Sequence, residues 1–291
     1  MTERAFANPP GMLPLFLRAG AALVPGASAL PFIAGGGREI PDLELVLTAV
    51  EVDGDRLAAY DRVCGFSLRD ELPSTFIHVL AFPLHLALMT DGSFPFPAVG
   101  LVHIENRITQ HRPARLGERL SIRVRATELA PHPKGKQFSV ISEARVGQEL
   151  VWEEVSVNLR RGEGGERPGG HGASTEELPL SAEWRLPGDL GRRYASVSGD
   201  HNPIHLHPLT ARLFGFPSAI AHGMWTKARS LAALEGRLPD AYTVEVSFRR
   251  PILLPGRVAF GELDAGDGAI SFGVRDTRKG SSHLVGSVRP A

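Results

Sequence analysis

A short, stiff segment brings a carboxylate, an amide and an imidazole within six residues of one another: Asp200, Asn202 and His205. Pro203 and Pro208 fix their own backbone φ and bias the preceding residues away from the helical region. A carboxylate and an imidazole on one rigid loop can share a single water molecule and exchange the roles of acid and base. The segment could therefore hold an acid–base pair, but Asp and Asn beside Gly and Pro usually mark a simple turn, and these residues alone leave both interpretations open.

Three other kinds of site are weaker interpretations of the same region and its surroundings. His201, His205 and His207 alternate along one stretch, where ligands seldom converge, and no distant cysteine or acid cluster supports them, so we predict no metal. Ser198 is not part of a nucleophile elbow, because no Gly-x-Ser-x-Gly precedes a helix. Gly35–Gly37 lacks the strand, loop and helix of a dinucleotide site. Acid–base chemistry without a cofactor remains the leading prediction.

The wider motif resembles the signature of MaoC-like dehydratases, which include R-specific enoyl-CoA hydratases and double-hotdog (3R)-hydroxyacyl-thioester dehydratases. The resemblance covers about thirty residues, and several fixed positions match together with their spacings. The matching positions are Tyr194, Ser198, Gly199, Asp200, Asn202, Pro203, His205, Ala211, Gly215, Pro217, His222, Gly223 and Met224.

The resemblance implies a catalytic pair, Asp200 and His205, that adds water across the C2–C3 double bond of a trans-2-enoyl thioester. It also implies that the backbone N–H of Gly223, near a helix start, stabilises the enolate oxygen, where exposed amides and the helix dipole favour negative charge. Asn202 is expected to orient the loop, and His222 is expected to be structural. Ser198, Gly199 and Pro203 are expected to support the loop.

The elements that position this loop follow from apolar periodicity. Helices are predicted over Ser74–Thr90 and Ser218–Glu235, and a short helix is predicted after His207, with Pro208 first and Gly215 just past its end. Alternation predicts strands with Tyr242, Val244, Val246 and Phe248 on one face, and two first-half strands with similar faces. Those faces hold Ile122, Val124 and Ala126 in one strand and Val155, Val157 and Leu159 in the other.

Both halves of the chain carry similar segments in the same order, which suggests a tandem duplication. One buried helix followed by antiparallel strands in each half predicts an α+β fold, a tandem (double) hotdog with each sheet wrapped around a central helix. The matched pairs are Tyr60–Phe66 with Tyr194–Asp200, Pro73–Leu80 with Pro217–Met224, and Arg112–Arg119 with Arg250–Arg257.

Domain limits follow from composition. Six of the eleven residues in Gly162–Gly172 are Gly, which predicts a flexible linker over residues 161–180. The remaining chain divides into an N-terminal lead-in at 1–39, a degenerate hotdog at 40–160 and a catalytic MaoC-like hotdog at 181–291. The lead-in is interrupted by prolines and carries Arg18, so neither a membrane span nor a secretory signal is predicted.

The first half departs from the catalytic pattern. Phe66 stands where Asp200 is, Val79 stands where Gly223 is, and the His-bearing loop is missing, so this half is predicted to be inert. Without that loop more room remains for an acyl chain, which favours medium-to-long substrates. The residues expected to line that acyl pocket are Phe76, Leu80, Phe82 and Leu86.

Composition limits the partners. With 32 basic and 32 acidic residues the net charge is zero, which argues against nucleic acid and anionic membrane as partners. The single cysteine, Cys64, excludes an internal disulfide and fits a cytoplasmic location. CoA or acyl carrier protein is the expected substrate carrier, and a monomeric double hotdog or its homodimer is expected. Solvated charges are the favoured interpretation of five residues that could instead meet carrier phosphates: Arg249, Arg250, Arg275, Arg278 and Lys279.

Two other functions stay open at this point. A hotdog acyl-thioesterase would share the fold and the thioester substrate, but its acid lies on the long helix or near its start rather than on a preceding loop. A non-catalytic acyl-thioester-binding subunit would not be expected to keep Asp200, His205 and Gly223 beside a decayed first half. The sequence therefore favours reversible hydration of trans-2-enoyl thioesters to (3R)-3-hydroxyacyl thioesters in fatty-acid metabolism.

Overall fold

The computed structural model describes residues 2–24, 26, 30, 33–35, 37, 39–162, 164 and 178–291. The chain forms two compact units. Unit 1 comprises Met1–Glu51, Ile77–Ile104 and Gly117–His171, and unit 2 comprises Val52–Phe76, Glu105–Leu116 and Gly172–Ala291. The units therefore interleave along the chain, whereas the sequence prediction divides it into contiguous halves. Most of the predicted linker at 161–180 lies outside the described residues.

Unit 1 is built on strands in the order β1-β2-β4-β6-β7, with β5 paired to β6. β1 runs parallel to β2, and the other pairs among these strands are antiparallel. The lead-in contributes β1 and the helix α1 to this unit. The bounds are β1 Thr2–Phe6, α1 Met12–Ala21, β2 Leu43–Val50, β4 Leu120–Ala126, β5 Ala130–His132, β6 Gly135–Val146 and β7 Glu149–Arg161.

Unit 2 holds an antiparallel sheet in which the second part of β3, Glu105–Gln110, pairs with β9. The order continues β9-β12-β11-β10-β8. The strand bounds are β3 Leu101–Gln110, β8 Leu180–Leu186, β9 Tyr242–Phe248, β10 Gly256–Gly266, β11 Ala269–Asp276 and β12 Ser282–Pro290. The helix bounds are α2 Gly54–Cys64, α4 Leu190–Ser198, α5 Pro203–Leu206, α6 Pro208–Leu213 and α7 Gly223–Leu234, followed by a 3₁₀ turn at Glu235–Arg237.

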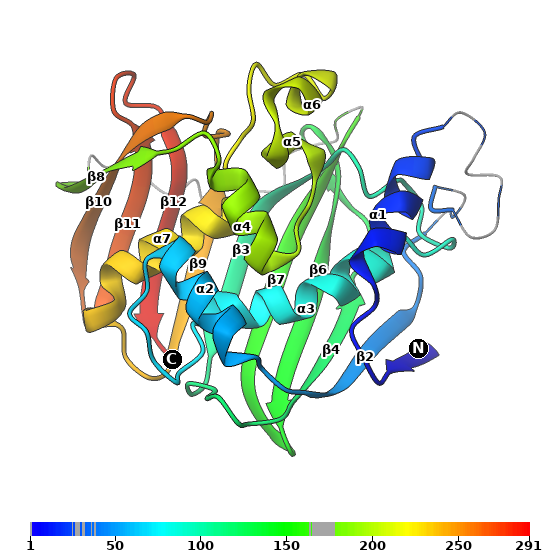
Figure 1. Cartoon of the computed structure of the whole chain (residues 1–291), viewed down its shortest axis with the longest axis horizontal. Coiled ribbons are helices and arrows are strands. Elements are labelled where there is room, and N and C mark those ends of the chain that lie inside the picture. The colour runs from blue at the N-terminus through cyan, green and yellow to red at the C-terminus, as the bar shows by residue number, and fades with distance from the viewer. Residues whose placement is uncertain are drawn as a thin grey trace. The chain divides into compact units, whose positions relative to one another are not determined.

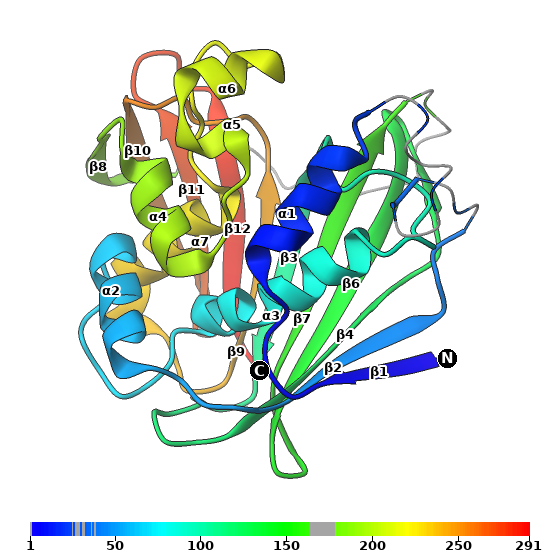
Figure 2. The ribbon, with the colours of Figure 1, turned by 45° about the vertical axis from the view of Figure 1, so that its right-hand side comes forward.

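Each sheet carries a central helix. In unit 2, α7 lies across β9, β12 and β11 (Figure 1). The helix α3, Ser74–Met89, begins in unit 2 and continues in unit 1, where it lies across β7, β6 and β4 (Figure 2). This arrangement of a sheet wrapped around a central helix, present twice, confirms the predicted α+β double hotdog. The predicted helix over Ser74–Thr90 is also confirmed, within one residue at its end.

The duplication is visible at two helix ends. α2 ends at Gly65 and α4 ends at Gly199, both with a left-handed backbone (φ 86° and 80°), which glycine adopts without strain. The rings of Tyr60 and Tyr194, one from each helix, lie 6.1 Å apart in the core of unit 2. The matched segments around these two glycines therefore fold alike.

One local prediction is wrong. Residues 218–222 are not helical, because the N–H of Ala221 bonds Ile252 O and the N–H of Leu254 bonds Ala219 O, so this segment pairs with a distant one. The strand predicted from Val155, Val157 and Leu159 is confirmed as part of β7, in which Leu159 is buried and Val155 and Val157 are half-buried. The buried side chains at this part of β7 are Trp152, Glu154 and Ser156.

The core of each unit is apolar apart from a few polar side chains. In unit 1 it includes Leu45, Leu47, Ile122 and Phe138, each at most 1% exposed. Burial of such side chains stabilises a fold by about 1.5–3 kcal/mol each. Within the described part of the chain, no helix is long and apolar enough to cross a membrane.

Candidate active site

The loop between α4 and α6 carries the predicted catalytic pair, and its backbone is held by side-chain hydrogen bonds. The N–H of Asp200 donates to Ser198 Oγ at 3.2 Å, and the N–H of Asn202 donates to Asp200 Oδ1 at 3.1 Å. The Asp200 side chain remains 26% exposed. Its carboxylate is thus fixed by the loop at one oxygen while still reaching solvent.

A single helical turn, α5, places His205. Asn202 Oδ1 accepts from the N–H of Ile204 at 3.4 Å, so Asn202 caps this turn, and Pro203 is its first residue. Thr210 Oγ1 donates to Pro203 O at 2.6 Å and ties α5 to α6. The predicted helix after His207 is confirmed as α6, with Gly215 in a left-handed conformation (φ 84°) just beyond it.

His205 is buried and its ring orientation is fixed. Its Nδ1 lies 2.8 Å from the carbonyl oxygen of Ile220, which can only accept, so Nδ1–H donates and the neutral ring keeps its lone pair on Nε2. Burial lowers the pKa of His205, against the opposing effects of the Asp200 charge and the Ile220 bond. A neutral imidazole with a free Nε2 is suited to accept a proton.

The helix α4 must approach this turn closely. A Cβ atom at Gly191 would collide with the backbone carbonyl oxygen of His205. A larger residue at this position would therefore push α4 away from the turn that carries His205.

His222 packs directly against the pair. Its ring stacks on that of His205 with centroids 3.7 Å apart, and its Nε2 donates to the backbone oxygen of Asp200 at 3.0 Å. Burial lowers the pKa of His222 to about 3, and the neighbouring His205 adds to this effect. His222 is therefore neutral at physiological pH, and its contacts link the Asp200 loop to the start of α7.

Gly223 is the first residue of α7, and His222 before it is extended (φ −66°, ψ 138°). The first N–H groups of a helix have no partner four residues earlier, and the helix dipole makes this end favourable for negative charge. A Cβ at Gly223 would lie 3.0–3.3 Å from ring atoms of Phe248. The absence of a side chain thus leaves the helix start open beside that ring.

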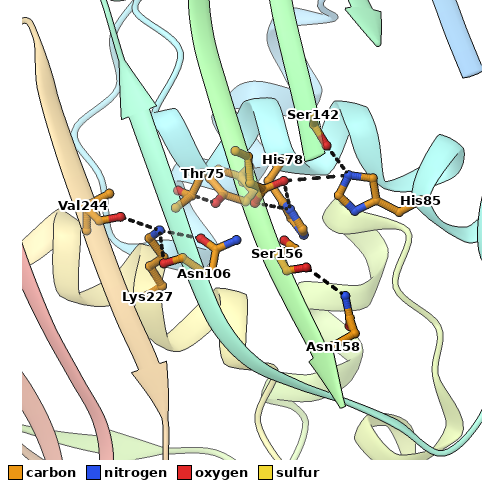
Figure 3. Close-up of polar contacts among 11 residues, drawn as sticks. Thr75, His78, His85, Asn106, Ser142, Ser156, Asn158, Lys227 and Val244 are labelled. Carbon is orange, nitrogen blue, oxygen red and sulfur yellow. Dashed lines mark hydrogen bonds and ion pairs between the residues drawn. The ribbon is translucent and has the colours of Figure 1, made fainter. Parts of the chain in front are cut away.

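The central helix also buries a lysine that the sequence reasoning missed. Lys227, four residues after Gly223, is 0% exposed and its Nζ donates to Asn106 Oδ1, Asn106 O and Val244 O (Figure 3). These bonds connect α7 to β3 and β9 within unit 2. A charged residue four positions after the glycine, and so on the same face of the predicted helix, was the available signal.

Two groups of side chains in the described residues place metal-ligating atoms within 4.8 Å of one another. One is Asp200, His205 and His222, which differs from the histidine series considered in the sequence, since His201 and His207 are exposed. The other, His78, His85 and Glu154, lies in unit 1 and was also missed. His78 and His85, seven residues apart on an apolar helix, were the signal for it.

The four residues predicted to line an acyl pocket all lie on α3, and their role there stays a prediction. Phe76, Leu80 and Leu86 are buried on α3 and Phe82 is half-buried. Phe76 belongs to unit 2 and the other three to unit 1. In the first half, Val79 lies in the interior of α3 and is fully buried, so that no helix begins at the position matching Gly223.

Comparison with known proteins places this geometry among dehydratases. A family model described as "MaoC like domain" matches residues 173–284. The chain is 37% identical over 266 residues to 3-hydroxyacyl-thioester dehydratase X of Mycobacterium tuberculosis, which covers 90% of this chain and 94% of that protein.

Solved structures agree. The crystal structure of HtdX of M. tuberculosis is similar with a TM-score of 0.76 and 36% identity, over 85% of this chain and 100% of that one. A second M. tuberculosis protein, described as having a double hotdog fold, is similar in fold alone, with a TM-score of 0.53 and 14% identity, over 89% of this chain and 98% of that one.

Proposed function

The chain belongs to the MaoC-like dehydratase family, in its double-hotdog form, and we propose that it catalyses the reversible hydration of trans-2-enoyl thioesters to (3R)-3-hydroxyacyl thioesters in fatty-acid metabolism. The observation that carries this proposal is the buried, neutral His205 with Nε2 free, held on the same loop as the Asp200 carboxylate. The (3R) handedness rests on the family resemblance alone.

The reaction needs one acid–base pair and one water molecule. In hydration, the oxygen of water bonds C3, a base removes one of its protons, and C2 receives a proton from the acid. Water supplies both the hydroxyl group and the net proton, so the pair returns to its starting state. His205 Nε2 accepts the proton of a water molecule that the partly exposed Asp200 carboxylate also holds, and the protonated pair then acts as the acid and delivers that proton to C2. Because water supplies all the atoms that are added, the reaction needs no cofactor.

In hydration, negative charge develops on the thioester oxygen as water adds at C3, and it is lost when C2 receives its proton. The first N–H of α7, at Gly223, is the group we assign to stabilise it, because helix N-termini present free amides. His222 acts as a positioning residue: it contacts the backbone of Asp200 and the ring of His205. Asn202 positions His205 by capping α5.

The substrate carrier, the chain length and the setting are finer parts of the same proposal. Arg249, Arg250, Arg278 and Lys279 are exposed, and they offer charge for the phosphates of CoA or of an acyl carrier protein. The first half lacks the catalytic loop, which favours medium-to-long acyl chains. We place the protein in the cytoplasm, as a monomer or homodimer; the single, buried Cys64 supports a reducing compartment.

The test is a hydration assay with trans-2-enoyl-CoA esters of four to sixteen carbons, followed by the loss of conjugated-thioester absorbance and by chiral analysis of the product. Asp200→Asn and His205→Ala are each expected to lower kcat/KM by about 10²–10⁴ while the protein stays folded. His201→Ala, an exposed residue of the same loop, is the matched control.

Three outcomes would contradict the proposal in different ways. Near-normal turnover of Asp200→Asn or His205→Ala would refute the mechanism. Release of free thiol without consumption of the double bond would identify a thioesterase. Activity restricted to the four-carbon ester would refute the medium-to-long preference while leaving the reaction intact.

A further inference from the structure

A second cluster of chemically capable side chains lies in unit 1 and contains no residue of the catalytic loop. His78 and His85 are seven residues apart on α3, so they point from the same side of the helix, and Glu154 lies on β7. Their side chains are 9%, 4% and 0% exposed. We refer to these three residues as the buried triad.

The triad is tightly assembled. His78 Nδ1 lies 2.8 and 3.0 Å from the two carboxylate oxygens of Glu154, and His85 Nε2 lies 3.8 Å from Glu154 Oε2. Figure 3 shows both imidazoles turned towards the sheet, with His85 Nε2 at 2.7 Å from Ser142 Oγ on β6. One donor atom from each residue of the triad lies within 4.8 Å of the other two.

The electrostatics of the triad favour a cation. A carboxylate with no exposed surface needs a compensating charge, because its desolvation costs several kcal/mol. Neutral imidazole and ionised carboxylate are the forms in which these side chains bind metal ions.

We propose that the buried triad is a binding site for a divalent transition-metal ion of the zinc class. Such ions take imidazole nitrogen at about 2.0–2.1 Å and carboxylate oxygen at about 2.0–2.2 Å in tetrahedral geometry, which sets neighbouring donors about 3.3–3.4 Å apart. The observed 2.8 and 3.8 Å separations lie on either side of that value. Side-chain shifts of less than about 1 Å would convert them to a metal site.

The donor set also selects the kind of ion. Two nitrogens and one carboxylate suit zinc or a neighbouring transition metal, whereas calcium and magnesium prefer oxygen ligands. Three protein ligands leave a fourth position, which the Ser142 hydroxyl or a water molecule can fill. Binding would displace the proton that His78 Nδ1 donates to Glu154, and that proton would be released to solvent.

The consequence for the protein is a cross-link within unit 1 that joins α3 to β7. Hydrogen bonds hold the same side chains without the ion, so the fold does not depend on the metal. The inference is independent of the proposed hydration reaction, because none of the triad belongs to the catalytic loop.

The experiment titrates chelator-stripped wild-type protein with Zn²⁺ in competition with a chromophoric chelator. One equivalent is expected to bind, and Glu154→Gln and His85→Asn are each expected to weaken this binding by at least about 100-fold. His205→Asn is the matched control, since it removes a donor from the other metal-capable group, Asp200, His205 and His222. That variant is expected to bind zinc as the wild type does.

Two measurements on the wild-type protein, its Tm with zinc and its absorption spectrum with cobalt, test the proposal even if a variant does not fold. Zn²⁺ at a hundred-fold excess over its Kd is expected to raise Tm by about 5 °C or more. Co²⁺ in its place is expected to give the intense visible absorption of a tetrahedral site. The proposal is overturned if wild-type protein binds no zinc below about 10 μM, or if His205→Asn abolishes binding and Glu154→Gln does not.

Discussion

The buried ammonium of Lys227 allows a sharp test of how α7 is fixed to its sheet. Lys227 is 0% exposed, and its Nζ donates to Asn106 Oδ1, Asn106 O at 3.4 Å and Val244 O at 3.3 Å. Gly223, one helical turn earlier, carries the N–H that we assign to the substrate oxygen. The bonds of Lys227 therefore set the position of that N–H relative to β3 and β9.

Two substitutions distinguish the effect of removing the Lys227 charge from the effect of removing its Asn106 partner. Lys227→Met keeps the volume but removes the charge, so it leaves buried neutral acceptors that have lost a donor, at a cost of about 1–3 kcal/mol of unfolding free energy. Asn106→Leu leaves the charge in place without its side-chain amide partner, and the loss of a hydrogen bond to a buried group costs about 1–3 kcal/mol, and more when that group is charged. Asn106→Leu is therefore expected to be the more destabilising change.

Urea denaturation of the two variants and of the double variant measures these free energies. The double variant is expected to be less destabilised than the sum of the single variants, because an apolar pair leaves neither a buried charge nor an orphaned amide. A smaller loss for Asn106→Leu than for Lys227→Met would refute the reasoning. It would mean that the ammonium is compensated by its other contacts and does not depend on Asn106.

Three further predictions concern pH and the helix start. Because burial lowers the pKa of His205, kcat/KM for hydration is expected to stay constant as pH falls to 6.5 and to decline only below it; a decline centred above pH 7 in the pH–rate profile would contradict this. The folded-state pKa values of His222 and His85, about 3 and about 4, lie below the unfolded value near 6.5. The stability that each neutral histidine contributes is thus complete above pH 6.5, and the free energy of unfolding falls by about 1.4 kcal/mol per pH unit for each as pH decreases below that value. Urea denaturation of the wild type and of His85→Gln at several pH values tests this. An equal dependence of unfolding free energy on pH in the two proteins would contradict it. Gly223→Ala puts a methyl group 3.0–3.3 Å from the Phe248 ring, so kcat/KM is expected to drop about 10-fold or more while Tm changes by only a few degrees; an unchanged kcat/KM would remove Gly223 from the proposed mechanism.

The parts of the site that could be predicted are those encoded locally. The αL residue after α4, the proline at the start of α6 and the glycine after it are all positions where one residue type fixes the backbone. Asp200 and His205 stand five residues apart between such positions. Their proximity therefore follows from a short stretch of sequence, with little help from the rest of the fold.

The start of α7 could not be predicted in the same way. Ser218 to His222 have side chains compatible with a helix, but Ile220 bridges to Leu253 across more than thirty residues. Ala219 O and the N–H of Ala221 find partners there, the N–H of Ile220 donates to Ile204 O, and the helix begins only at Gly223. The later start of α7 matters because, in a helix that began at Ser218, the N–H of Gly223 would already be hydrogen-bonded within the helix.

Which face of β7 is buried also depends on the elements that pack against the strand. The stretch from Glu154 to Leu159 alternates, and the valines alone would put Val155 and Val157 inward. A shift of one residue reverses the two faces of a strand, so its partners decide which face is buried. His78 and His85 on α3 supply polar partners for the other face, and Glu154 and Ser156 are buried instead.

The buried polar side chains determine how each central helix is rotated about its axis, which apolar burial alone does not. A helix such as α3 is apolar nearly all round, so burial gives little preference for one rotation about its axis over another. A side chain that must find a hydrogen-bond partner does give such a preference, because a wrong rotation would leave it unsatisfied at a cost of about 1–3 kcal/mol. His78 and Glu154 fix α3 in unit 1, and Lys227 with Asn106 fixes α7 in unit 2. Of these two helices, α7 begins at Gly223, to whose N–H we assign the thioester oxygen, so in unit 2 the bonds of Lys227 would also position the proposed oxyanion donor. In unit 1 the corresponding polar side chains form the triad that we propose as a metal site.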